Sequence, residues 1–426
     1  MIVLSGASLV LPDRVLSPGT LVIEDGRIAE IRSDTPSGGH AAFAFHGHYI
    51  VPGFIDLHVH GIDGVDALDA RPDGGAVAAI AARLPRYGVT AFCPTTVACG
   101  PEALRRVLDQ VRSARKTPAS RSARVLPAHL ESNFINPEYN GAQPASCLRS
   151  PRAALDSPAD AGHDLPLGRA KASAERSDFT AADILAEIER ATPDVGIVTL
   201  ASELDGGLDL VRRLASRGHR VSLGHSSATY DEALAAIAAG ARHATHLFNR
   251  MPPLGHRAPG LVGAVLQTDE IAAEIICDGV HVHPALIRIA IAAKRPSRIF
   301  AITDATAAAG LPPGSRAMLG GQPITAGEHT ALLADGTIAG SVLTMERAFQ
   351  TLVGRVGLSL VDAATICATT PARELGLVGH GVLAPEAVAD LVVLDANFSV
   401  VQTYLGGRLV YSRGQATEPT EESSLF

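Results

Sequence analysis

The chain has 426 residues, of which 46% are hydrophobic, 19% charged and 4% aromatic, enough to form one large domain or two to three smaller ones. Its formal net charge is -8, which leaves no excess of cations for a polyanion, so we expect no nucleic-acid partner. No apolar run is long enough to span a bilayer, so we expect no membrane partner either.

The cysteine pattern bears on the cellular compartment. The five cysteines are scattered and form no Cys-x-x-Cys pair, which predicts neither a disulfide framework nor a cysteine zinc site, and favours a reducing, cytoplasmic location. The first residues, MIVLSGASLVLPDR, lack a basic segment and are interrupted by Gly6 and Pro12, which is typical of a strand and not of a signal peptide. P-loop, G-x-S-x-G and G-x-G-x-x-G motifs are absent from the sequence.

The two ends of the chain resemble each other in pattern. Residues 1–51 contain short strand-like runs such as LVIEDGRIAEI, in which Asp25-Gly26 indicates a hairpin turn. Near the other end, ADLVVLDAN and VVQTYLGGRLVYS are again predicted strands, the second with a double-glycine turn. We therefore predict one small β-sandwich domain assembled from both termini, residues 1–51 and 379–426.

The middle of the chain, residues 52–378, alternates apolar strand-like runs with helix-like stretches rich in Ala, Leu and Arg. The strand-like runs are FIDLHVH, VTAFCPTTV, ARVLPAHLE, VGIVTLASE, RVSLGHS, HATHLF, IAAEIICDG and RIFAITDA. Eight such units predict a parallel (β/α)8 barrel of the α/β class. A polar stretch at about 148–179 breaks the alternation, and we interpret it as a loop insertion that is either a lid on the functional face or a surface segment.

Ionisable side chains end most of these runs, at the end of the barrel where active sites lie. They are Asp56, His58, His60, His129, Glu131, His225, His246 and Asp304. Alternate residues of a strand face the same side, so His58 and His60 can point toward one ion. Because buried ionisable groups are costly unless they are paired or bound to a metal, the joint pattern predicts a divalent-metal site. His129 lies one layer deeper than Glu131, which favours a supporting role.

The ligand types limit the chemistry. Imidazole and carboxylate ligands without a thiolate suit Zn, Fe, Mn or Co, and the pattern does not choose among them. Such a site lowers the pKa of a bound water and polarises a carbonyl, while a nearby carboxylate transfers protons. The residues therefore point to metal-assisted hydrolysis.

Longer blocks of sequence resemble a known family. PGFIDLHVHG resembles the opening signature of the amidohydrolase superfamily, and HLE, LGHSSATYDEA, THLFNRMPPLGHRAPGLVGA, ICDGVHVHP and ITDATAAAG, in that order, resemble N-acetylglucosamine-6-phosphate deacetylases. The resemblance covers nearly the whole chain. It implies a homodimeric hydrolase that removes acetate from a phosphorylated amino sugar, most simply converting N-acetylglucosamine 6-phosphate to glucosamine 6-phosphate in amino-sugar metabolism.

The resemblance also implies a role for each matching residue. The principal metal would be held by Glu131, His225 and His246. His58 and His60 match a pair that binds a second ion in some members, so we expect one or two ions, with Glu131 as the bridge. Asp304 matches the general base. The implied substrate-binding residues are Gln143, Asn249, Arg250, Arg257 and His281, among which Asn249, Arg250 and Arg257 surround the expected phosphate position, where a guanidinium can bind two oxygens.

The chain departs from the family pattern at two places beside the predicted site. Ser132-Asn133 replaces the usual Gly-Pro after HLE, and Gln143 stands where some members have a histidine that polarises the acetyl carbonyl. Deacetylation of N-acetylgalactosamine 6-phosphate or of another N-acyl substrate therefore remains an alternative. A dihydroorotase-like site is disfavoured because VGIVTLASE contains no lysine, and a non-catalytic barrel is disfavoured because Asp304 and the histidines are all present.

Overall fold

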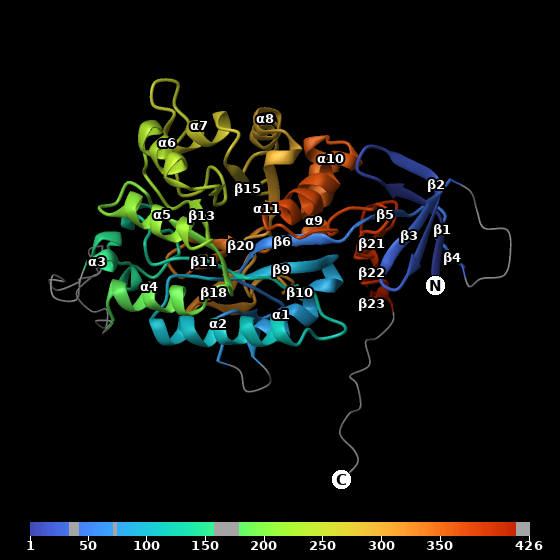
Figure 1. Cartoon of the computed structure of the whole chain (residues 1–426), viewed down its shortest axis with the longest axis horizontal. Coiled ribbons are helices and arrows are strands. Elements are labelled where there is room, and N and C mark those ends of the chain that lie inside the picture. The colour runs from blue at the N-terminus through green and yellow to red at the C-terminus, as the bar shows by residue number, and fades with distance from the viewer. Residues whose placement is uncertain (34–41, 71–74, 157–178, 415–426) are drawn as a thin grey trace, which may run out of the picture.

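The structure, a computed structural model, describes residues 1–33, 42–70, 75–156 and 179–414. A barrel surrounded by helices lies beside a separate sheet that contains strands from both ends of the chain (Figure 1). The predicted insertion at about 148–179 falls largely outside the described residues; its first part contains the short helix α3 (Pro151–Leu155).

Eight parallel strands form the barrel. They are β6 (Phe54–Val59), β9 (Val89–Thr96), β11 (Ala128–Glu131), β12 (Val195–Leu200), β13 (Arg220–Leu223), β14 (His243–Ala244), β15 (Ala272–Ile276) and β16 (Ile299–Ile302). Neighbours in this order are hydrogen-bonded, and a bridge between Val59 and Ala305 joins the first and last strands. The prediction of a (β/α)8 barrel is thus confirmed.

Helices cover the outside of the barrel (Figure 1). They are α1 (Ala76–Arg83), α2 (Pro101–Lys116), α4 (Ala181–Arg190), α5 (Gly207–Ser216), α6 (Tyr230–Ala239), α7 (Gly260–Gln267), α8 (Pro284–Lys294), α9 (Met345–Thr351), α10 (Leu360–Ala364) and α11 (Thr370–Glu374). In α5, for example, Leu210, Val211 and Leu214 are buried at the three- and four-residue spacing of one helix face. Helix α6 begins with a capping box in which Thr229 and Glu232 each accept a hydrogen bond from the other's backbone.

Shorter turns connect these elements. They are the 3-10 turns Leu84–Tyr87, Pro137–Tyr139, Ala145–Cys147 and Pro296–Arg298, and the π-helical turns Leu352–Val356 and Thr365–Thr369. Strand β10 (Arg124–Val125) pairs with β9, and β7 (Gly61–Ile62) pairs with β8 (Val65–Asp66).

The terminal strands form one eight-stranded sheet. They are β1 (Ile2–Val10), β2 (Val15–Glu24), β3 (Arg27–Arg32), β4 (Ala42–Ala44), β5 (Tyr49–Pro52), β21 (Leu391–Leu394), β22 (Val400–Leu405) and β23 (Arg408–Ser412). The order is β23-β22-β21-β5-β1-β2-β3, with β4 beside β1, so the two chain ends meet where β5 pairs with β21. The predicted assembly from both termini is confirmed, and these strands enclose an apolar core of their own that includes Leu4, Ile50 and Leu391. The division into residues 1–51 with 379–426 and 52–378 stays a proposal.

A further sheet, which the residue pattern did not predict, follows the last barrel strand. Its antiparallel strands are β17 (Arg316–Leu319), β18 (Gln322–Ala326), β19 (Thr330–Leu333) and β20 (Ile338–Ser341). The backbone N–H of Ser341 donates to the carbonyl of Asp304 at 2.8 Å, which joins this sheet to the carboxyl end of β16. Residues of β17 and β20 consequently reach the predicted site.

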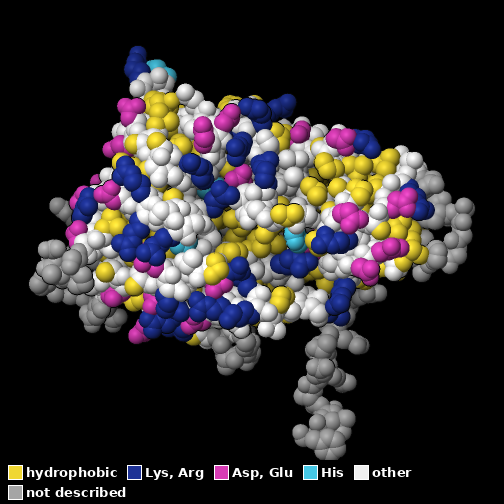
Figure 2. Space-filling model, in the orientation of Figure 1, with side chains coloured by type: hydrophobic (Ala, Val, Ile, Leu, Met, Phe, Trp, Pro, Cys, Tyr) yellow, Lys and Arg dark blue, Asp and Glu magenta, His cyan; other side chains and the backbone are white. Residues whose placement is uncertain are grey.

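The visible surface carries mixed charge. Figure 2 shows basic and acidic side chains interspersed, with basic groups gathered along α2 at the lower edge. There Arg105 pairs with Glu187, and Arg112 with Asp194 at 2.9 Å, so these two basic groups of α2 have acidic neighbours. No helix in the described part of the chain has both the length and the apolar character needed to cross a membrane.

Candidate metal centre and active site

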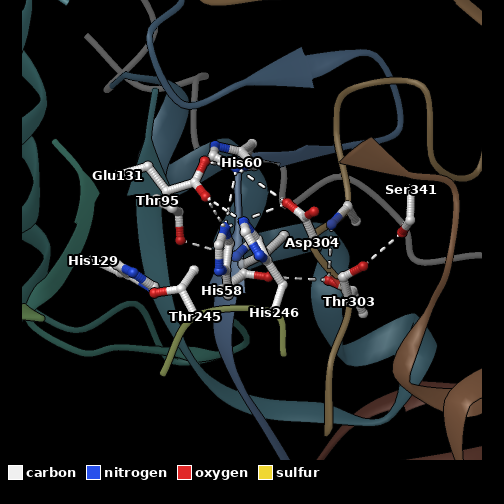
Figure 3. Close-up of polar contacts among 12 residues, drawn as sticks. His58, His60, Thr95, His129, Glu131, Thr245, His246, Thr303, Asp304 and Ser341 are labelled. Atoms are coloured by element: carbon white, nitrogen blue, oxygen red, sulfur yellow. Dashed lines mark hydrogen bonds and ion pairs between the residues drawn. The ribbon is translucent and has the colours of Figure 1, made fainter. Parts of the chain in front are cut away.

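All five predicted metal ligands converge at the carboxyl ends of barrel strands. Figure 3 shows His58, His60, Glu131 and His246 pointing toward one another, with Asp304 beside them. His225 belongs to the same group through its contact with Glu131. All are nearly inaccessible to solvent. The parallel barrel explains the convergence, because its strands all end at the same rim.

Glu131, His225 and His246 form the first three-residue group of candidate ligands. Glu131 Oε1 lies 3.0 Å from His225 Nε2 and 3.0 Å from His246 Nε2, and the two nitrogens are also 3.0 Å apart. Two ring nitrogens and a carboxylate oxygen thus face one common point. This is the arrangement that ligands adopt around a cation.

His58, His60 and Glu131 form the second group. His58 Nε2 and His60 Nε2 are 3.2 Å apart, and His60 Nε2 lies 3.3 Å from Glu131 Oε2. Oε2 of Glu131 thus faces His60, while Oε1 faces His225 and His246 and lies 3.7 Å from His58 Nε2. That geometry fits the bridging position expected of Glu131.

Buried acceptors orient two of the imidazoles. His58 Nδ1 lies 3.0 Å from Glu274 Oε2, and His225 Nδ1 lies 2.8 Å from the carbonyl of Tyr139. Because Nδ1 carries the proton in such a contact, Nε2 is left with its lone pair toward the site. By contrast, both ring nitrogens of His129 are engaged, with the Leu57 carbonyl at 3.0 Å and Thr199 Oγ1 at 2.8 Å, which fits its expected supporting role.

The pKa values of the candidate ligands indicate that the cluster favours bound positive charge. Burial opposes protonation of His60, but Asp304 and Glu131 raise its pKa to about 10; His246 is likewise raised to about 9, mainly by Glu131. Burial alone would raise the pKa of Glu131, yet His225 and His58 hold it well below its usual range. In addition, Nδ1 of His60 and of His246 are buried without a hydrogen-bond partner. The donor set thus fits a divalent cation, which neutral imidazoles can bind in place of those protons.

Asp304 lies against the second group, with Oδ1 at 3.3 Å from Nε2 of both His58 and His60. Burial would raise its pKa, but these two imidazoles lower it to about 2, so its carboxylate is ionised at neutral pH. The backbone of Asp304 is held on both sides, since its N–H donates to the His58 carbonyl at 2.9 Å and its own carbonyl accepts from Ser341.

Asp56, although it ends the same run as His58 and His60, is not in either ligand group. Asp56 Oδ2 accepts from Thr303 Oγ1 at 2.6 Å, and Oδ1 accepts from the N–H groups of Thr303 and His58 at 3.2 Å each. Burial raises its pKa to about 7. Asp56 therefore joins the first and last barrel strands beneath the site.

A cavity of about 450 Å³ opens above the ligands. Four predicted substrate residues line it, namely Gln143, Asn249, Arg250 and His281. His281 is held by Asp278, whose Oδ2 is 2.6 Å from His281 Nδ1.

Arg257 does not line the cavity. It is exposed in the loop between β14 and α7. In that loop the Gly255 N–H donates to the Ala258 carbonyl at 3.2 Å, which closes a turn containing Arg257.

Comparison with known proteins agrees with the motifs. Residues 49–410 match the model of the Amidohydrolase family. N-acetylglucosamine-6-phosphate deacetylase of Mus musculus is 36% identical over 429 residues, which cover 97% of this chain and 95% of that protein. The chain belongs to the N-acetylglucosamine-6-phosphate deacetylase family of amidohydrolases. The family prediction is therefore confirmed.

Bacterial members of the deacetylase family match over a similar length. The N-acetylglucosamine-6-phosphate deacetylase of Bacillus subtilis is 32% identical and is covered to 97%. Among solved structures, that of the Mycobacterium smegmatis deacetylase in complex with N-acetyl-D-glucosamine-6-phosphate has a TM-score of 0.82 at 31% identity, covering 96% of this chain and 99% of that one. The Thermotoga maritima deacetylase gives 0.79 at 28% identity, covering 96% and 100%.

Several residues of this deacetylase-family site were not predicted. Glu274 is fully buried in the middle of β15, and the only sign of it in the sequence was a carboxylate within the apolar part, IAAEII, of its run. Tyr139 contributes its backbone carbonyl, which any residue type has. The apolar part of the cavity lining, Val97, Phe248, Met251, Leu319 and Ile338, comes from loops, strand ends and the unpredicted sheet.

Proposed function

We propose that this chain is a divalent-metal-dependent deacetylase that hydrolyses N-acetylglucosamine 6-phosphate to glucosamine 6-phosphate and acetate. The observation that carries the proposal is the shared carboxylate: Glu131 presents one oxygen to His225 and His246 and the other to His60, with ionised Asp304 alongside. A cavity large enough for a sugar phosphate lies directly above this cluster. The M. smegmatis relative, solved in complex with that sugar phosphate, supports the choice of substrate.

The residues divide the reaction between them. When bound, the metal lowers the pKa of a water molecule and polarises the acetyl carbonyl. Glu131, His225 and His246 would hold the principal ion, and His58 and His60 a second; Zn, Fe, Mn and Co all suit these ligands. Asp304 takes the proton of the attacking water and returns it to the nitrogen of the departing amine. Its ionised state at neutral pH leaves it free to accept that proton.

Residues that line the cavity position the substrate. We assign Arg250 and Asn249 to the phosphate, since both line the cavity and a guanidinium can bind two phosphate oxygens. His281, fixed by Asp278, orients the sugar, and the Gln143 amide lies next to Glu131, where the acetyl group would be. The phosphate contact of Arg257, which is exposed in the single chain, stays a prediction.

We further propose that the protein is a homodimer and works in the cytoplasm. The family resemblance supports the dimer. All five cysteines are free thiols, and burial of Cys93, Cys99, Cys277 and Cys367 fits a reducing compartment.

Acetate release tests the proposed function. Protein reconstituted with Zn, Fe, Mn or Co is given N-acetylglucosamine 6-phosphate, its galacto epimer, and unphosphorylated N-acetylglucosamine. We expect rapid release from the gluco phosphate, with kcat/KM at least about 100-fold lower without the phosphate because the ion contacts at Arg250 are lost. Faster turnover of the galacto epimer would instead identify N-acetylgalactosamine 6-phosphate as the substrate. Failure with all three, with metal bound, would refute the proposed function.

A further inference from the structure

Ser132 and Asn133, the two residues that follow Glu131, are each only 3% exposed. Ser132 Oγ donates to the Thr199 carbonyl at 2.6 Å, which joins the end of β11 to the neighbouring strand β12. Asn133 reaches different segments, and neither side-chain interaction would be available to a Gly-Pro pair. The side-chain hydrogen bonds at these two positions therefore exist only because this chain has Ser132 and Asn133 in place of Gly and Pro.

The side-chain amide of Asn133 connects two backbone segments. Its Nδ2 donates to the Cys99 carbonyl at 2.9 Å and to the Cys147 carbonyl at 2.7 Å. Cys99 follows β9, and Cys147 belongs to the segment 140–149, here named the Gln143 loop. Because an amide nitrogen carries two hydrogens, Asn133 uses its full donor capacity on these two carbonyls. Its own backbone carbonyl accepts from the N–H of Arg149, at the end of the same loop, at 2.8 Å.

Gln143 forms a second connection between the same segments. Its Oε1 accepts from the N–H of Ala98 at 2.7 Å, and its Nε2 donates to Glu131 Oε2. The two amides thus close a ring: Ala98-Cys99, Glu131 to Asn133, and the Gln143 loop are each linked to the other two.

The ring determines where the Gln143 amide lies. Because the Ala98 N–H occupies Oε1, the NH2 group of Gln143 must face Glu131 and the cavity. Its position therefore depends on the separation between the backbone near Ala98 and the Gln143 loop. Asn133 sets that separation by joining Cys99 to Cys147. Arg149 strengthens the loop, since it is fully buried and donates to the carbonyls of Ser146 and Leu148.

We propose that Asn133 is a positioning residue that acts through Gln143, holding its amide against Glu131 at the acetyl end of the cavity. The kinetic part of this inference rests on the proposed function. Asn133 itself does not line the cavity, so its effect on turnover must pass through the Gln143 loop.

A double-mutant cycle tests this coupling. We compare Asn133→Ala, Gln143→Ala and the double variant with the native enzyme, and use Gln350→Ala as a matched control. The Gln350 amide also donates to two groups, the Asn397 carbonyl at 3.3 Å and Ser399 Oγ at 3.2 Å, away from the cavity. Asn133→Asp keeps the volume but replaces the donor by a carboxylate oxygen facing two carbonyls.

We expect Asn133→Ala and Asn133→Asp each to lower kcat/KM by roughly 10- to 100-fold, as small displacements of a catalytic group do. The double variant should lose no more than Gln143→Ala alone, because the two residues act as one unit. Gln350→Ala should lower the Tm without changing kcat/KM. If the losses of Asn133→Ala and Gln143→Ala multiply in the double variant, Asn133 does not act through Gln143.

Hydrogen exchange gives a readout that needs no substrate. Peptides covering residues 140–149 should exchange faster in Asn133→Ala and Asn133→Asp than in the native protein, while Gln350→Ala leaves them unchanged. Unaltered exchange in both Asn133 variants would overturn the positioning role. If the native protein releases no acetate, the proposed function fails, and the exchange experiment still decides the role of Asn133.

Discussion

His225, His246 and Asp304 share a backbone conformation that is uncommon outside glycine, with φ values of 47°, 30° and 50°. Each such residue costs roughly 1–3 kcal/mol, so the surrounding contacts must hold it in place. For Asp304 those contacts are the backbone hydrogen bonds to His58 and Ser341. These hydrogen bonds fix the backbone from which the Asp304 side chain reaches His58 and His60.

Replacement of Asp304 tests the assignment of the general base. Asp304→Asn keeps the shape of the side chain but removes the proton acceptor, so we expect kcat to fall about 10²- to 10⁴-fold. The ligands Glu131, His225 and His246 are unchanged in this variant. The dialysed protein should therefore retain the metal that they hold, as measured by elemental analysis beside the native protein. A variant that kept near-native kcat with normal metal content would show that another group accepts the proton.

Metal binding should be linked to proton release. In the metal-free protein the pKa values of His60 and His246 are raised to about 10 and about 9, so both rings are protonated at pH 7. Ligation requires neutral rings, so binding expels protons, and metal affinity should fall as the pH is lowered. Titration calorimetry at pH 7 in buffers of different ionisation enthalpy measures this release. An observed heat that is independent of the buffer would contradict it.

The sequence was sufficient for the residues that contribute side chains at strand ends. His58 lies next to the last residue of β6, Glu131 ends β11 and His246 follows β14 by two residues, so the barrel topology brings them together. The role of Glu274 was not predicted, because this residue lies inside its strand, where the residue pattern predicts burial and not function. Arg257 lies outside the cavity in the single chain, because the path of a long loop is set by tertiary contacts and not by local pattern; its phosphate contact stays a prediction.

At the scale of elements, Asp390 connects the terminal sheet to the barrel. It is 3% exposed, and its Oδ1 and Oδ2 lie 3.1 and 3.2 Å from the Arg124 guanidinium of β10. Oδ1 also accepts from the Gly406 N–H at 2.7 Å, and Oδ2 lies 3.0 Å from His380 Nδ1. One buried carboxylate thus holds three segments.

Asp390→Asn should lower the free energy of unfolding by about 2 kcal/mol, less than a fully buried pair would lose, because the Arg124 side chain is 38% exposed. Burial opposes ionisation, but His380 and Arg124 lower the pKa of Asp390, so its contribution is present above the unfolded-state pKa and disappears as the pH falls through the lower folded-state value. Urea unfolding at pH 7 and in acid measures both effects.

Asp109→Asn serves as the control, since Asp109 is 52% exposed and its pair with Arg190 is a surface contact that should contribute less than about 1 kcal/mol. An Asp390→Asn variant as stable as this control at pH 7 would contradict the prediction.

Element boundaries were less predictable than element types. The run ARVLPAHLE, predicted as one strand, is divided into β10 and β11 around Pro127, which has no N–H to donate to a ladder. Strands β17 to β20 have four or five residues each and follow glycine-rich turns, which is too short for a clear alternation of apolar and polar residues.

At the scale of the whole molecule, repetition made the barrel predictable, because eight alternating units leave few other folds. The terminal sheet was predictable in outline, because both ends of the chain contain short strand-like runs with glycine turns. Its strand order was not, since the antiparallel pairing of β5 with β21 depends on a contact between residues far apart in the sequence.

That pairing also matters while the protein is being made. Strand β5 emerges from the ribosome more than 300 residues before β21, the strand that covers its edge. Until then, the apolar residues Ile50 and Val51 belong to a sheet edge with open backbone donors and acceptors, a surface prone to pair with other chains. Ribosome stalling or premature termination late in translation should therefore release a chain with a nearly complete barrel and an aggregation-prone edge beside it.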